Sequence, residues 1–126
     1  MRFNHNKKFI ELENANFNIA EDVSQLDERL SGIKWITPDY NDRPLDEINL
    51  LINAKNILLE QKERKILVTD YQFLSSLLVN EFASPNKWYD DITVPNKENK
   101  YYNDYRDFFL GKIINNQIKY IYFIGI

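Results

Sequence analysis

The sequence predicts an α/β fold with one small, Rossmann-like parallel sheet of three or four strands flanked by helices. The alternation of predicted elements indicates the fold class, and the chain length indicates the number of domains. Short apolar runs rich in β-branched residues alternate with segments of helical periodicity, which is typical of parallel strands joined by right-handed crossovers. The length of 126 residues fits one domain and buries enough surface without a metal or a disulfide, so we expect residues 1–126 to form a single α/β domain.

The first part of the chain favours short elements. Residues 9–12 favour a short strand. Residues 22–30 predict a short helix, because their apolar residues fall at helical spacing and Gly32 occupies the position of a C-terminal cap. Residues 33–37 are rich in large apolar and β-branched side chains and predict a strand that ends at Pro38.

The clearest helix runs from about Pro44 to Gln61. Asp42 is a candidate N-cap, and Pro44 falls in the first turn, where a missing N–H costs little. Apolar residues cover most of the circumference, so the helix must be covered on more than one side. A sheet with a neighbouring helix or a partner chain could provide this cover, and we favour the sheet.

The second part of the chain repeats the alternation of strand and helix. Residues 65–70 predict a strand buried on both faces, and residues 73–78 a short helix. Residues 82–100 form a long irregular stretch, which is often functional. A helix over residues 100–115 and a strand over residues 118–124 follow. The apolar stripe of that helix is Tyr102, Tyr105, Phe109 and Ile113.

The composition excludes several kinds of site. The chain has no cysteine, which removes thiol nucleophiles, cysteine zinc sites and disulfides. Its single histidine, His5, lies beside the N-terminus, where a fixed catalytic base is rare. The net charge of −3 argues against a basic DNA-binding face, so we expect no nucleic-acid partner. No apolar run approaches the ~20 residues that cross a bilayer, so we expect the chain to be soluble as written.

Ligands of open α/β sheets bind beyond the carboxyl ends of the strands. This rule makes Asp39, Asp70 and Gln72 candidate ligand-binding residues, since each follows a predicted strand. Asp70 could bind a sugar hydroxyl or a cation, but we favour a cap on the following helix. Asp39 and Asp70 could also form a general acid/base pair if the two strand ends are neighbours.

Residues 84–91 mix aromatic and polar side chains, which makes Trp88 and Tyr89 further candidates for ligand binding. Such side chains stack on sugar rings or dock onto another surface. The alternative, which we favour, is a loop anchored by Trp88 against its own core, because tryptophan is usually well buried.

The usual cofactor and metal motifs are absent. No Gly-x-Gly-x-x-Gly or phosphate-binding glycine loop follows a strand, so we expect no NAD, FAD or ATP and no other cofactor. Asp104 and Asp107 are one helical turn apart, which is more typical of a solvated helix face than of a metal site. We assign no catalytic residue and no metal ligand.

Three segments carry a resemblance: LSGIKWITP at 30–38, ILVTDYQF at 66–73 and SPNKWYD at 84–90. With them the chain resembles the soluble, water-exposed domains of bacterial polytopic membrane glycosyltransferases similar to the dolichyl-phosphate-mannose–protein mannosyltransferases. The resemblance implies a larger parent protein with many transmembrane helices, which takes a sugar from a polyprenyl-phosphate donor. It also implies that the catalytic carboxylate lies in an early extracytoplasmic loop that this chain lacks, so no catalytic residue is carried over.

The leading interpretation is therefore an accessory domain on the extracytoplasmic (periplasmic) face of such a membrane protein. It would act beside the protein's own transmembrane region and bind or orient a glycan or protein acceptor, without catalysis of its own. Two alternatives are open. One is a free-standing enzyme that acts on a sugar or phosphate ester through Asp39 and Asp70, and the other is a protein-interaction module that uses the long helix or the Trp88 loop.

Overall fold

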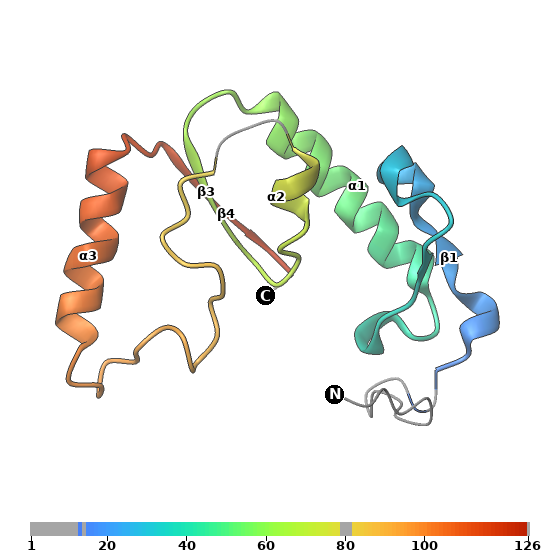
Figure 1. Cartoon of the computed structure of the whole chain (residues 1–126), viewed down its shortest axis with the longest axis horizontal. Helices are drawn as coiled ribbons and strands as arrows, with labels where there is room; N and C mark the ends of the chain where they lie inside the picture. Colours follow the sequence, from blue (N-terminus) through green and yellow to red (C-terminus); the bar gives the residue numbers. More distant parts are fainter. Residues whose placement is uncertain (1–12, 14, 79–81, 126) are drawn as a thin grey trace, which may run out of the picture. The chain divides into compact units, whose positions relative to one another are not determined.

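The computed structural model describes residues 13, 15–78 and 82–125 (Figure 1). It divides the chain into two compact units, residues 1–54 and 55–126. The strand predicted at 9–12 and the single histidine lie outside the described residues. Among the described residues, no helix combines the length and the apolar character needed to cross a bilayer.

The first unit is built from very short elements. Strands β1 (Glu21–Asp22) and β2 (Lys34–Trp35) pair antiparallel. The same unit contains four 3-10 helices: η2 (Phe17–Ile19), η3 (Val23–Gln25), η4 (Glu28–Leu30) and η5 (Pro38–Tyr40). The strand predicted over residues 33–37 is thus present but shorter, and its partner is antiparallel.

The helix predicted over residues 22–30 is wrong: two separate 3-10 turns stand in its place. The carboxylate of Asp22 accepts the N–H of Ser24 at 2.9 Å, and that of Asp27 accepts the N–H of Arg29 at 3.0 Å. Short acidic side chains that bond to the backbone two residues ahead start a new turn, so they interrupt one continuous helix. Gly32, with a φ of +84°, then reverses the chain into β2.

Helix α1 (Pro44–Glu60) begins at the proline that the sequence indicated. In the first unit its residues Ile48 and Leu51 are fully buried, as is Val23. The carboxylate of Glu47 is also buried and accepts hydrogen bonds from Trp35 Nε1 and Thr37 Oγ1, both at 2.7 Å. A buried charge with two donors fixes the helix to the segment around β2.

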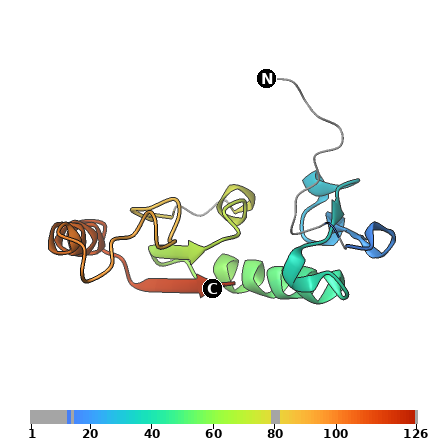
Figure 2. The same cartoon turned by 90° about the horizontal axis from the view of Figure 1, so that it is seen from below.

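The second unit contains a parallel pair of strands, β3 (Lys65–Thr69) and β4 (Tyr120–Ile124) (Figure 2). The register runs from Lys65 opposite Tyr120 to Thr69 opposite Ile124. All five residues of β3 are buried, as the β-branched run predicts. Helices α2 (Leu74–Leu77) and α3 (Tyr102–Asn115) lie in the crossover between the two strands, so the predicted helix at 100–115 is confirmed.

The predicted sheet of three or four parallel strands is wrong, because the described residues form two separate two-stranded sheets, one antiparallel and one parallel. In the second unit, residues 82–84 occupy the place of a third strand. Phe82 forms an isolated bridge to Lys65, and the N–H of Ala83 donates to Lys65 O at 3.2 Å. The hydroxyl of Ser84 then accepts from the N–H of Leu67 and donates to its carbonyl, at 3.2 and 3.0 Å. One side chain therefore satisfies a strand edge that would otherwise need another strand.

Candidate functional site

A groove of about 330 Å³ lies in the second unit. It is predominantly apolar and combines the stripe of α3 with one face of β4, one residue of β3 and the segment between α2 and α3. Its lining consists of Val68, Tyr89, Val94, Pro95, Tyr102, Tyr105, Arg106, Phe109, Leu110, Ile121 and Phe123.

Two features of the sequence hold the walls of this groove. On α3 the ring of Tyr105 packs against that of Phe109, with centroids 6.1 Å apart. In the opposing segment Asp90 closes a turn, since its carboxylate accepts the N–H groups of Ile92 and Thr93 at 3.0 and 2.8 Å. These hydrogen bonds, those from Thr93 first, lower the pKa of Asp90, so the turn holds its charge at neutral pH.

Two phenol groups in the lining have no hydrogen-bond partner within the described residues. They are the buried hydroxyls of Tyr89 and Tyr105. Burial raises the pKa of both groups, and the neighbouring Tyr89 adds to the rise at Tyr105. The backbone of Asn86 and the side chain of Ser84 offset part of the rise at Tyr89, and the side chain of Asn86 does so at Tyr105, although none of these neighbours reaches hydrogen-bond geometry. The hydroxyls are therefore neutral at pH 7. A buried polar group without a partner is costly, so each is suited to bond with a ligand or a water molecule.

Arg106 is the charged residue in the lining. Its Nη2 and Nε atoms lie 2.9 and 3.1 Å from Oδ1 of Asp107. Both side chains are more than half exposed, so solvent screens the pair and the guanidinium remains able to meet a second acceptor.

A second, more enclosed cavity of about 290 Å³ lies at the carboxyl end of β3 and includes the predicted site residue Gln72. Its polar groups already serve the fold. Thr69 Oγ1 donates to Ile124 O at 2.8 Å, and Gln72 Nε2 donates to Thr69 O at 2.5 Å. Ser75 Oγ donates to Gln72 O at 2.9 Å. Since these groups already bond to the backbone, the cavity has fewer polar groups available for a ligand than the groove has.

The two predicted acidic residues lie in different places. Asp39 is exposed in η5 of the first unit, and Asp70 is exposed after β3 in the second. Asp70 does not cap the next helix, because α2 begins at Leu74 and its N-cap position is Phe73, whose side chain gives no capping hydrogen bond. Asp70 also lies outside the lining of both cavities. A general acid/base pair of Asp39 and Asp70 stays an untested prediction.

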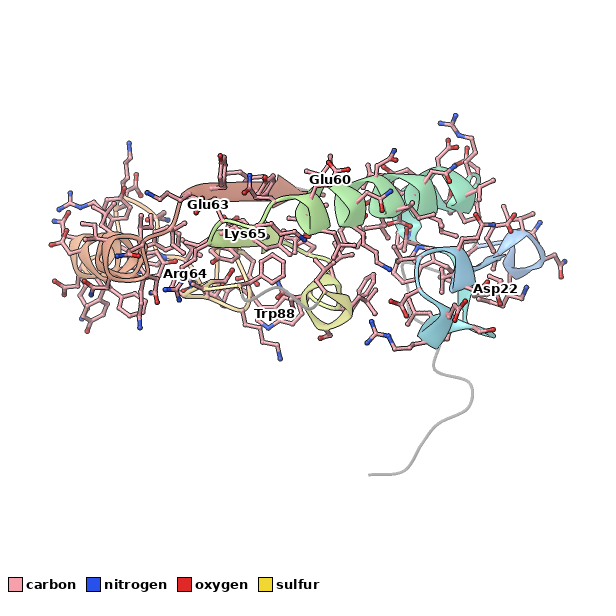
Figure 3. All side chains as sticks on the ribbon, turned by 90° about the horizontal axis from the view of Figure 1, so that it is seen from above. Asp22, Glu60, Glu63, Arg64, Lys65 and Trp88 are labelled. Atoms are coloured by element: carbon pink, nitrogen blue, oxygen red, sulfur yellow. The ribbon has the colours of Figure 1, made fainter. Side chains whose placement is uncertain are left out.

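The two aromatic candidates lie in different surroundings. Trp88 (Figure 3) is 46% exposed, so it does not anchor the loop in the core. Lys87 Nζ lies 5.9 Å from the centroid of its ring. Tyr89 is the one that turns inward and lines the groove. The helical spacing of apolar residues in the sequence had indicated that Tyr105 and Phe109 lie on one face of α3. Nothing in the sequence indicated that Phe123 lines the groove, because this depends on which face of β4 lies toward α3.

Among the described residues Lys65 is the most deeply buried charged residue, at 1% exposed against 2% for Glu47, and it has a structural role (Figure 3). Its ammonium donates to the carbonyl of Gln61 at 2.5 Å and to that of Glu63 at 3.4 Å. It thereby satisfies carbonyls just beyond the end of α1. Burial, together with the charge of Lys62, lowers the pKa of this lysine.

Comparison with protein-family models, with curated proteins and with solved structures finds no match for this chain. The assignment of function therefore starts from the groove.

Proposed function

We propose that this chain is the acceptor-binding domain of a bacterial polytopic membrane protein of the glycosyltransferase type, placed on the extracytoplasmic face and without a catalytic centre of its own. The resemblance of segments 30–38, 66–73 and 84–90 supports this kind of parent protein. The single observation that carries the binding role is the apolar groove with its two unpartnered phenol hydroxyls. Two of the three segments contribute to it, through Val68 and Tyr89.

The groove favours a polypeptide acceptor over a glycan. Its volume lies at the lower end of the range of about 300–1,000 Å³ that is usual for ligand sites. A sugar needs several polar groups along the wall, whereas this lining is mostly aliphatic and aromatic. A peptide supplies apolar side chains for the walls, and its backbone N–H and C=O groups would pair with Tyr89 and Tyr105.

A binding experiment tests the groove. The 126-residue chain is screened against displayed random peptides and, separately, against soluble oligosaccharides. We expect peptides with apolar side chains to bind, and Phe109→Ala to weaken this binding about tenfold or more, because it removes a wall of the groove. Phe108→Ala is the matched control, since Phe108 is 48% exposed on the same helix and does not line the groove.

Two outcomes would reject this binding role. One is equal affinity of both alanine variants for the selected peptides. The other is binding of oligosaccharides alone, which would assign the groove to a glycan.

The parent protein is tested independently. The reading frame that flanks residues 1–126 in its genome should encode several transmembrane helices, and a topology reporter fused to this region should lie on the extracytoplasmic side. A frame without membrane helices would reject the membrane assignment and leave the binding result standing.

A further inference from the structure

The outer edge of β4 is an unused hydrogen-bonding edge. Among the described residues β4 has one neighbour, β3, and the far edge of β3 is already closed by residues 82–84. The exposed fractions of Phe123, Tyr120 and Ile121 are 70%, 45% and 39%. No charged residue, proline or bulge interrupts the strand, although natural proteins usually protect edges in one of these ways.

The hydrogen bonds identify which backbone groups face this edge. The backbone of Lys65 and Leu67 bonds toward residues 82–84, so the alternate residues of β3 face β4. The register sets Ile66 opposite Ile121 and Val68 opposite Phe123, and in a parallel ladder a residue bonds with the neighbours of its partner, so the set that includes Ile124 faces β3. The carbonyl of Ile124 also accepts from the side-chain hydroxyl of Thr69. The alternation then leaves the N–H and C=O groups of Ile121 and Phe123 along the open edge.

We infer that β4 pairs antiparallel with β4 of a second copy of this chain, in the register that places Tyr122 opposite Tyr122. This register sets Ile121 against Phe123 of the second copy and uses both outward N–H groups and both outward C=O groups of each strand. It places an aromatic residue opposite a β-branched residue, which is a favourable cross-strand pair. Lys119 falls opposite Gly125, so no like charges meet.

The occupant is a second copy because this strand is complementary to itself. The pairs across the two-fold axis are all apolar or aromatic, and no foreign sequence is needed to match them. The two-stranded parallel sheet of each copy would become part of a four-stranded sheet. Such a sheet is more stable than an isolated pair of strands.

The test measures the molar mass of the full chain by sedimentation over a roughly thousandfold range of concentration. We expect a rise from the 15.1 kDa of one chain to twice that mass. Phe123→Lys should weaken the dimer about tenfold or more, because the symmetry removes two cross-strand pairs at once. Phe108→Lys is the matched control and should leave it unchanged, since Phe108 is also an exposed phenylalanine, at 48%, but lies on α3.

Amide hydrogen exchange gives a second measurement that needs no variant. At high concentration the amides of Ile121 and Phe123 should become protected, whereas that of Tyr122 should be protected at both high and low concentration. A chain that stays monomeric throughout, or a dimer that Phe108→Lys disrupts and Phe123→Lys does not, would overturn the inference. A dimer without concentration-dependent protection of these two amides would overturn it as well.

Discussion

Two buried polar clusters in this chain have opposite energetic character. In the first unit the carboxylate of Glu47 is matched by donors from Trp35 and Thr37. In the second unit the hydroxyls of Tyr89 and Tyr105 are buried without a partner among the described residues. The first cluster is therefore expected to stabilise the fold, whereas the second is left for a ligand or a water molecule.

Replacing Glu47 should destabilise the first unit. Glu47→Ala removes the acceptor of two part-buried donors and the buried carboxylate itself, and we expect a loss of about 3 kcal/mol in the free energy of unfolding. Chemical denaturation followed by circular dichroism measures it. Glu60→Ala is the control, because Glu60 lies exposed on the same helix. This variant should lower the free energy of unfolding by at most about 0.5 kcal/mol. Equal losses for the two variants would remove the role given to Glu47.

The two groove tyrosines should make stability fall at alkaline pH. Because burial raises their pKa in the folded chain, the unfolded chain loses these protons first, near the ordinary tyrosine pKa of about 10. The folded state then binds more protons than the unfolded state, and stability decreases as the pH rises above that value. Below it these groups contribute no pH dependence.

The variant Tyr89→Phe with Tyr105→Phe should flatten this alkaline decrease and retain stability at pH 7, since it removes two unpartnered hydroxyls. Denaturation curves at neutral and alkaline pH measure both effects. Tyr101→Phe, at a residue that is 57% exposed, should leave the alkaline decrease in place. A double variant as sensitive to alkali as the wild type would contradict the assignment.

At the scale of elements, the sequence allowed prediction of what depends on repeated local signals. Helices α1 and α3 follow from apolar periodicity and from Pro44, and β3 follows from its continuous apolar run. The turns at 22–30 were not predicted, because the side-chain bonds of Asp22 and Asp27 outweighed the apolar spacing.

The absence of a third strand beside β3 and part of the groove lining depend on which segments meet in the folded chain. The periodicity of a sequence does not contain this information. Nothing in the sequence marks Ser84 as the residue that would replace a strand beside Leu67. The stripe of α3 did indicate Tyr105 and Phe109. Phe123 could be placed in the same groove only once the pairing of β4 was known.

Removing the Ser84 hydroxyl should weaken the second unit. Ser84→Ala removes the hydroxyl that bonds to both the N–H and the C=O of Leu67, so we expect a loss of about 1–3 kcal/mol and faster amide exchange at Leu67. Denaturation and hydrogen exchange measure these effects. Ser76→Ala, at an exposed position in α2, serves as control and should change stability by at most about 0.5 kcal/mol. Unchanged exchange at Leu67 in Ser84→Ala would show that the hydroxyl is dispensable.

At the scale of the whole molecule, charge and exposed apolar surface act against each other. The net charge is −3 at pH 7 and the pI is about 5.2. Large apolar side chains are exposed in both units, among them Phe17 at 58% and Ile114 at 73%. The repulsion between copies therefore opposes association at neutral pH and disappears near the pI.

Self-association should increase as the pH is lowered from 7 toward the pI. The physical reason is the loss of net negative charge, and added salt at pH 7 should reproduce part of the effect by screening. Light scattering at matched protein concentration measures it. A scattering signal that is the same at both pH values and insensitive to salt would show that charge does not govern association.

The hydroxyl of Ser84 also limits how far strands of this protein can stack. An assembly that grows by adding chains along a sheet needs two free borders on every member, as amyloid ladders have. In the second unit the outer edge of β3 already bonds to the hydroxyl of Ser84, so only the edge of β4 can pair with another chain. The inferred pairing through β4 would therefore close as a dimer, and the sheet of the second unit would not extend further.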